Sequence, residues 1–274
     1  MGTRLATPIA QDQVDAFWRD GACCLRGMID QHWIGRLRAA VEDDLRGPGP
    51  LAIEYAKNGG RFLGDIGVWA IRPELRAFVF ESPAAEIAAT FLRAERVRFF
   101  YDHLFVKEPG TAERTPWHQD QPYWPVAGRQ VLSIWLALDD VTLDSSGMEY
   151  VKGSHAWGKT FRPRHFSGAD DPYKDLPGEP IPDFDALRGE HTFLSWDMKA
   201  GDCLLHHAMT VHGSAGNATS NQRRRAYATR WVGEDATYAP RAGQPRLTID
   251  PIPLSPGDPL ECAVFPCVLP RSGA

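Results

Sequence analysis

The spacing of apolar residues changes near residue 96, and this change limits the folds that the chain can adopt. Before this point apolar residues recur at helical spacing, and after it short apolar runs alternate with glycine and proline turns. Helices that precede many short strands are typical of helices packed outside a β-sandwich. We therefore predict a mainly β fold in which helices flank a β-sandwich or jelly-roll core.

Three helices are expected in the first part of the chain. Ile9 to Arg19 has helical spacing, and Gly21 ends it before a short strand over 22–25. Asp30 can cap a second helix, which ends at the Gly-Pro-Gly-Pro of 47–50. Ser82-Pro83 is typical of the start of a third helix that runs to about Arg93. We place this helical flank at 1–95.

The jelly-roll core is expected over 96–235. Its clearest strands are the aromatic run Val97 to Lys107, the apolar run Val131 to Leu138 and the alternating run Arg225 to Val232. The segment 236–274 is a proline-rich tail, interpreted either as an extended cover or as a partly mobile end. Since all-β chains of 274 residues commonly remain undivided, we expect 1–274 to be one domain.

Composition excludes several classes of protein. Hydrophobic residues make up 43% and charged residues 24%, which is typical of a globular protein and argues against general disorder. The formal net charge of -5, without a basic stripe, gives no sign of nucleic-acid binding. No apolar run is long enough to span a bilayer, and no signal peptide is recognised, so we expect a cytoplasmic protein without a membrane partner. Five cysteines without zinc-type spacing are interpreted as free thiols.

Two fragments predict a metal site. Trp117-His118-Gln119-Asp120 places a histidine and a carboxylate two residues apart, so on a strand both side chains point to one face. His212, in a distant strand, can complete a face of two histidines and one carboxylate, which is typical of non-heme iron(II) oxygenases. The neighbouring His206 and His207 are interpreted as structural residues.

Further fragments appear in a consistent order along the chain. They are Asp15 to Gly21, Phe105 to Gly110, Trp117 to Asp120, Trp135 to Asp140, Gly147 to His155, Gly201-Asp202 and His212 to Ser214. With these fragments the chain resembles the phytanoyl-CoA dioxygenase family of iron(II)- and 2-oxoglutarate-dependent oxygenases. The resemblance extends over most of the sequence. It implies a double-stranded β-helix fold and an enzyme that uses iron(II), 2-oxoglutarate and O2.

The resemblance also implies roles for individual residues. His118, Asp120 and His212 should bind iron, while Arg224, Ser214, Trp135 and His103 should contact 2-oxoglutarate. Counting forward from His212 favours Arg223 as the co-substrate arginine, whereas the Arg-Arg-Ala pattern of the family favours Arg224, which we select. Arg223 and Arg225 would then lie solvated on the opposite face of the strand. Related halogenases lack the carboxylate ligand, so Asp120 favours hydroxylation.

The substrate is expected to be a small, largely apolar molecule, because aromatic residues stand beside the metal motifs. Candidates for the pocket wall are Arg61, Phe62, Trp69, Tyr123, Trp124 and His155. The basic stretch from Lys159 to His165 either meets an anionic substrate or is a solvated loop. The sequence does not indicate an oligomeric state.

Two other functions are compatible with the fold. A cupin-like metal enzyme that does not use 2-oxoglutarate would be expected to carry His-x-His with a nearby Glu, which the main motif lacks. A non-catalytic jelly-roll binding protein is the third interpretation, and the complete set of metal ligands argues against it.

Overall fold

The computed structural model describes residues 8–57, 59–164, 173, 176 and 178–270. Within these residues the helices are α1 (Gln11–Asp20), α2 (Gln31–Arg46), α3 (Pro73–Glu81) and α4 (Ala84–Leu92), with short 3-10 helices at Val68–Ala70, Gln121–Tyr123 and Ser154–Ala156. The strands of the first half are β1 (Ala22–Leu25), β2 (Ile53–Glu54), β3 (Phe62–Ile66), β4 (Val97–Lys107), β5 (Thr115–His118), β6 (Val126–Ala127) and β7 (Val131–Ala137). Those of the second half are β8 (Met148–Val151), β9 (Phe193–Leu194), β10 (Cys203–His207), β11 (His212–Ser214), β12 (Arg224–Val232), β13 (Thr237–Tyr238) and β14 (Cys267–Leu269).

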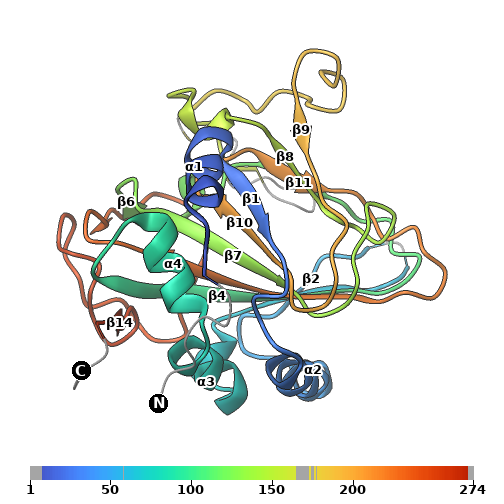
Figure 1. Ribbon diagram of the computed structural model, residues 1–274, viewed down its shortest axis with the longest axis horizontal. Coiled ribbons are helices and arrows are strands. Elements are labelled where there is room, and N and C mark those ends of the chain that lie inside the picture. Colours follow the sequence, from blue (N-terminus) through green and yellow to red (C-terminus); the bar gives the residue numbers. More distant parts are fainter. Residues whose placement is uncertain (1–7, 58, 165–172, 174–175, 177, 271–274) are drawn as a thin grey trace.

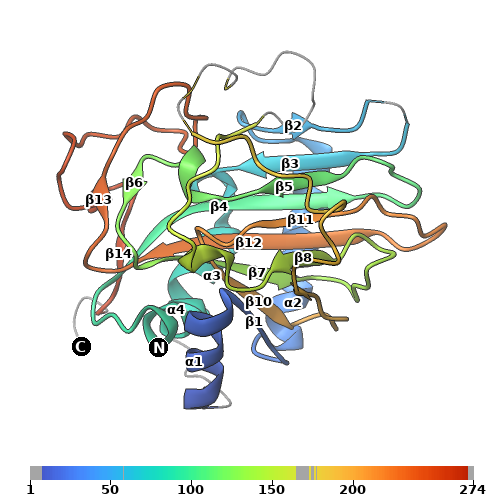
Figure 2. The same ribbon diagram turned by 90° about the horizontal axis from the view of Figure 1, so that it is seen from above.

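The strands form two main antiparallel sheets. The larger sheet has the order β1-β10-β7-β12-β4-β3-β2, with β14 paired to β4, and the smaller has the order β5-β11-β8-β9. Figure 1 shows the smaller sheet lying over one face of the larger, and Figure 2 shows the same arrangement from above. The two sheets are the walls of a jelly roll, so the predicted fold class is confirmed.

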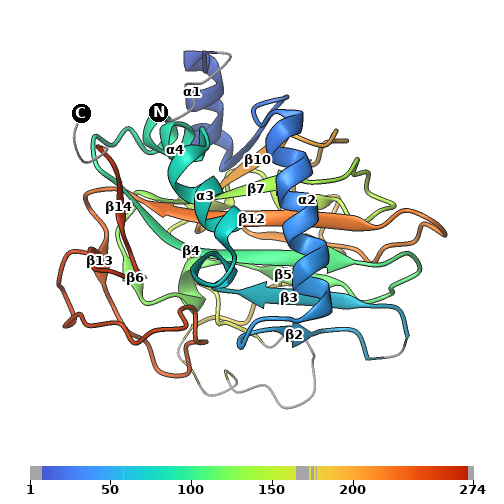
Figure 3. The same ribbon diagram turned by 90° about the horizontal axis from the view of Figure 1, so that it is seen from below.

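Helices cover the other face of the larger sheet. Figure 3 shows α2 and α3 crossing the outer face of β12 and β4, with α4 beside them. The apolar residues of these helices pack on outward side chains of the strands, as Phe78 of α3 does on Tyr227 of β12 at 5.6 Å between ring centroids. The helices thus cover one face of the larger sheet, and the face toward the smaller sheet is left available for a binding site.

The predicted elements agree closely with the structure. Helices lie where the helical spacing placed them, and the Asp30 carboxylate accepts a hydrogen bond from the Trp33 backbone as the predicted cap of α2. Ser82 likewise accepts from the Ala84 backbone at the start of α4. Helix α3 was not predicted. It has nine residues and directly precedes Ser82-Pro83, so its short apolar period was interpreted as a loop.

The segment after residue 236 packs on the body of the molecule. Leu247, Leu260 and Phe265 are buried in one apolar cluster with Phe100 and Trp124. Two short strands, β13 and β14, pair with β6 and β4. The described part of this segment therefore covers one end of the space between the sheets. No helix in the described ranges is long and apolar enough to cross a membrane.

Candidate metal centre and its pocket

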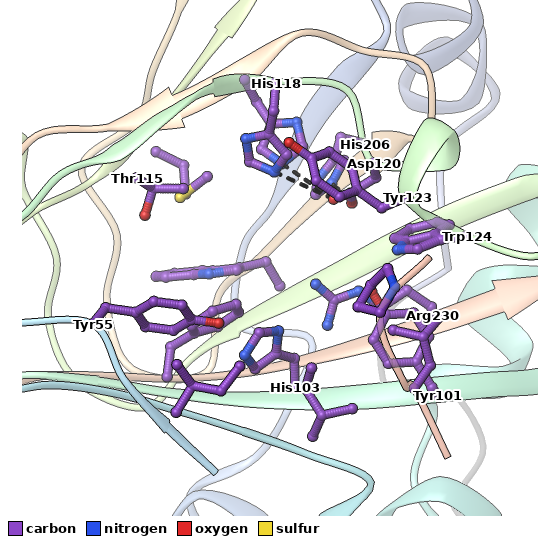
Figure 4. Close-up of a pocket in the computed structure, with 18 of the residues that line it drawn as sticks. Tyr55, Tyr101, His103, Thr115, His118, Asp120, Tyr123, Trp124, His206 and Arg230 are labelled. Carbon is purple, nitrogen blue, oxygen red and sulfur yellow. Dashed lines mark hydrogen bonds and ion pairs between the residues drawn. The ribbon is translucent and has the colours of Figure 1, made fainter. Parts of the chain in front are cut away.

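Two side chains from the smaller sheet and one from the turn that follows β5 converge on one point. His118 at the end of β5 and His212 at the start of β11 are paired across the antiparallel ladder, and their ring centroids are 4.1 Å apart. Oδ1 of Asp120 lies 3.4 Å from Nε2 of His118 and 3.8 Å from Nε2 of His212. All three residues are buried, and their ligand atoms lie within 4.8 Å of one another. Figure 4 shows His118 and Asp120 on one wall of the pocket.

The backbone fixes the orientation of both imidazoles. Nδ1 of His118 is 2.8 Å from the Pro116 carbonyl, and Nδ1 of His212 is 2.9 Å from the Thr210 carbonyl. Because a carbonyl oxygen only accepts, each Nδ1 carries the proton and each Nε2 presents a lone pair. This is the tautomer that a metal-binding histidine requires, with its second nitrogen held by an outer partner.

The Asp120 carboxylate is held ionised in a buried place. Burial opposes its charge, but the adjacent imidazoles of His212, His118 and His206 hold the pKa of Asp120 well below its ordinary value. Burial, with the neighbouring His118 and His206, holds the pKa of His212 well below its ordinary value. At neutral pH the cluster therefore offers one carboxylate oxygen and at least one neutral imidazole, which suits a divalent metal ion.

A fourth residue contacts the carboxylate from behind. Oδ2 of Asp120 lies 3.1 Å from Nε2 of His206 and accepts a hydrogen bond from Oγ of Ser133 at 3.2 Å. His206 was interpreted as a structural histidine, and its neighbour His207 does have a structural contact, with the Arg129 carbonyl. His206 instead supports a member of the cluster, which the sequence pattern did not indicate.

Arg224 is the arginine of its run that enters the pocket. It is buried, its guanidinium lies 5.6 Å from the Trp135 ring centre, and it donates to Oγ of Ser146 at 3.1 Å. Burial lowers the pKa of Arg224 to about 10, so it stays cationic at neutral pH. Its Nε has no hydrogen-bond partner among the described residues, and no carboxylate there pairs with it.

The flanking arginines lie on the opposite face, as predicted, but they are ion-paired rather than simply solvated. Arg223 contacts Glu108 at 2.8 Å and Glu42 at 2.9 Å. Arg225 contacts Asp139 at 2.6 Å and the same Glu42, and its side chain is only 16% exposed. These pairs connect β12 to α2 and leave neither guanidinium in the pocket.

The other predicted co-substrate residues lie near Arg224. Trp135 and His103 flank Ala228 on the neighbouring strands β7 and β4, and both line the pocket. Ser214 lies 3.2 Å from Ser146 through their hydroxyl groups, and Lys107 donates to Ser146 at 2.8 Å. Ser146 has a φ of 71°, a strained backbone for serine, and its hydroxyl contacts the side chains of Arg224, Lys107 and Ser214.

Four of the six predicted pocket-wall residues lie elsewhere, and only Tyr123 and Trp124 of that set line the pocket, together with Arg164 of the basic stretch. Trp69 is buried on the helical side, packed on Phe99. Arg61 faces solvent beside Glu54, and His155 contacts the Trp18 carbonyl outside the jelly roll. The Lys107 ammonium lies over the aromatic ring of Phe62. His165 lies outside the described residues.

Arg230 is a second buried arginine in this pocket, and it was missed. Its guanidinium lies 4.7 Å from the ring centre of Tyr101 and 5.9 Å from that of Trp124. Figure 4 shows these three residues at the end of the pocket beyond Asp120. The sequence did contain evidence for this position, because Arg224 and Arg230 are six residues apart on one strand and therefore lie on the same face of it.

The chain matches the sequence model of the family described as phytanoyl-CoA dioxygenase (PhyH) over residues 17–226. A dioxygenase named aneA from Aspergillus aculeatus is 27% identical over 237 residues, which cover 80% of this chain and 70% of that protein. The multifunctional dioxygenase prhA from Penicillium brasilianum is 23% identical over 246 residues, covering 81% of this chain and 72% of that protein.

Solved structures of similar proteins share the fold. The carbocyclase SnoK of nogalamycin biosynthesis, described as non-heme and α-ketoglutarate dependent, is 26% identical with a TM-score of 0.74, covering 97% of this chain and 99% of that chain. The epimerase SnoN of the same biosynthesis is 21% identical with a TM-score of 0.74, covering 94% of this chain and 98% of that chain.

Proposed function

The chain belongs to the phytanoyl-CoA dioxygenase family, and we propose that it is an iron(II)- and 2-oxoglutarate-dependent dioxygenase that hydroxylates a C–H bond of a small organic substrate. One observation carries the proposal. Two imidazole Nε2 atoms and one carboxylate oxygen converge at the wall of a pocket that also holds Arg224, a buried guanidinium that has no carboxylate partner within the described residues.

The residues present fit iron(II). Two imidazole nitrogens and one carboxylate oxygen on a single face would hold the ion and leave its other positions open for further ligands. Both histidines already have their outer nitrogen held by a backbone carbonyl. Bound iron(II), 2-oxoglutarate and O2 would supply the oxidative attack on the substrate, with release of succinate and carbon dioxide.

The residues also fit 2-oxoglutarate. Arg224 lines the same pocket as His118, Asp120 and His212, and we call the part of this pocket between Arg224 and the metal cluster the trough. A dicarboxylate can lie in this trough with one end at the metal, while Arg224 binds the other carboxylate, assisted by the hydroxyls of Ser146 and Ser214. Trp135 and His103 border the trough and would hold the molecule in place.

The protein's own contribution is binding, orientation and the exclusion of water. Aromatic and apolar residues enclose the remainder of the pocket, among them Tyr101, Tyr123 and Trp124. A buried site of this kind strengthens electrostatic contacts and keeps solvent from the reacting carbon. The presence of Asp120 supports hydroxylation over halogenation, since its carboxylate takes the position that a halide would need. The apolar wall supports a small, largely apolar substrate.

The test uses the intact protein without oxygen. Addition of iron(II) and then 2-oxoglutarate should produce a weak visible charge-transfer band, and admission of O2 should release succinate. His118→Ala should lose the band, whereas His207→Ala should keep it, because His207 contacts a backbone carbonyl away from the cluster. Absence of both the band and succinate from the unaltered protein would contradict the proposal.

A further inference from the structure

Arg230 resembles Arg224 in its surroundings. Among the described residues three arginines are buried, and one of them, Arg98, pairs with Glu261 at 2.8 Å. Arg224 and Arg230 have no carboxylate within ion-pair distance in the described part of the chain. Arg230 donates to the Ala228 carbonyl at 3.0 Å, and its Nε has no partner there. A buried charge without a counter-ion is costly, so this place is suited to an anion.

Arg230 lies away from the part of the pocket in which 2-oxoglutarate is proposed to bind. Arg230, Ser133 and His206 are paired across β12, β7 and β10, and they share the face on which Asp120 lies. Arg224 lies six residues away on the same strand, roughly 20 Å by the rise of an extended chain. One short dicarboxylate that reaches the metal from Arg224 therefore leaves Arg230 on the far side of the metal cluster.

The sum of the charges at the site also leaves Arg230 without a counter-ion. The positive charges of iron(II) and Arg224 equal the negative charges of Asp120 and 2-oxoglutarate, so the charge of Arg230 is left over. The nearest carboxyl on the adjoining strand is Asp102, which points to the helical side and accepts from Trp69 and Tyr227. Burial raises the pKa of Asp102 to about 7, so it is a poor counter-ion.

We infer that Arg230 binds an anionic group of the substrate and that the substrate is an organic acid with an apolar body. Tyr101 and Trp124 flank the guanidinium, and Ile66 and Leu247 continue the wall as apolar side chains. A carboxylate on Arg230 would fix one end of the molecule and bring its apolar part past the metal cluster. This inference rests on the proposed function, because it assigns Arg224 to 2-oxoglutarate.

The test measures binding without turnover. Protein saturated with iron(II) and 2-oxoglutarate in the absence of O2 is titrated with hexanoate, octanoate and decanoate, and with the alcohols of the same lengths. Tryptophan fluorescence, to which Trp124 beside Arg230 contributes, and the visible band report binding. We expect at least one acid to bind roughly tenfold or more tightly than its alcohol, as a charge-assisted contact provides. Arg230→Met should abolish this preference and Arg230→Lys should retain part of it, while Arg223→Met should leave it unchanged.

Two outcomes overturn the inference. One is the absence of any acid-over-alcohol preference in the unaltered protein, including the case in which no member of the series binds; this requires no variant to fold. The other is a preference that survives Arg230→Met in a protein that still forms the visible band. A missing band in the unaltered protein is a different result, because it contradicts the proposed function.

Discussion

Nε2 of His206 lies 3.1 Å from Oδ2 of Asp120, while Oδ1 of the same carboxylate faces the two ligand histidines. Burial lowers the pKa of His206, so the ring is neutral, and against a carboxylate its Nε2 must carry the proton and donate. Ser133 donates to the same oxygen at 3.2 Å. One oxygen of the carboxylate is thus held from behind, and the other is directed to the metal position.

His206→Leu should therefore weaken metal binding, because Oδ2 loses a donor and the carboxylate becomes free to rotate. Loss of such an outer contact typically costs about 10–100-fold in metal affinity. His206→Gln keeps a donor of similar reach and should recover much of the affinity. Competition between the protein and a chelator for manganese(II) measures the effect without turnover. His207→Leu is the matched control, and equal affinities for His206→Leu and the unaltered protein would show that His206 is only structural.

Arg224→Met should weaken 2-oxoglutarate binding by about 30-fold or more, since removing one partner of a buried charge pair costs about 2 kcal/mol at least. Titration of the visible band with 2-oxoglutarate in the absence of O2 gives the dissociation constant. Arg223→Met and Arg225→Met should bind normally, because their side chains pair with Glu42 on the outer face. Normal binding by Arg224→Met would assign the co-substrate to another group.

The sequence predicted those parts of the site that depend on local periodicity. The period of two placed Arg223 and Arg225 on the face opposite Arg224, which was itself selected from the resemblance. The His-x-Asp spacing indicated that His118 and Asp120 lie in one place, although Asp120 follows the end of β5. The same period could have identified Arg230. Between Arg224 and Arg230 the small side chains stand at every second position, which indicates that the two arginines face the same side of the sheet. The contact of His206 with Asp120 could not be predicted this way. It depends on the register of β10 and β7 and on a loop 86 residues away.

The pocket wall was predicted less well for the same physical reason. No local rule says which face of a sheet a loop or helix will cover. Trp69 follows β3 and packs on the helical side, whereas Trp124 follows the metal motif and faces the pocket. Long-range packing decides between such positions, and aromatic composition does not.

Gly64→Ala should narrow the pocket. Gly64 lies in β3 opposite Phe105, and a Cβ there would lie 2.6 Å from Nε2 of His103 and 2.6 Å from a ring carbon of Tyr55. Both side chains line the pocket and would be pushed into it. We expect weaker 2-oxoglutarate binding, together with a loss of about 1–3 kcal/mol in the free energy of unfolding.

Titration of the visible band and urea unfolding together measure both effects of this substitution. Gly35→Ala in α2 is the control, because a Cβ at Gly35 meets open space and alanine favours the helix. It should be as stable as the unaltered protein or more so, with unchanged 2-oxoglutarate binding. Unchanged binding in Gly64→Ala would mean that His103 and Tyr55 do not limit the space for the co-substrate.

Asp102→Asn should alter how stability depends on pH. Burial raises the pKa of Asp102 to about 7 in the folded protein, whereas the unfolded chain has the ordinary value of about 4. Between these two values the folded state binds more protons than the unfolded state, so the free energy of unfolding falls as pH rises, by about 4 kcal/mol in total for this group.

Asparagine cannot ionise, and its side-chain oxygen can still accept from the Trp69 backbone and the Tyr227 hydroxyl. The free energy of unfolding of Asp102→Asn, relative to the unaltered protein, should therefore become more favourable from about pH 4 to about pH 8 in urea unfolding. A constant difference for Asp102→Asn would mean that this carboxyl is ionised throughout the range.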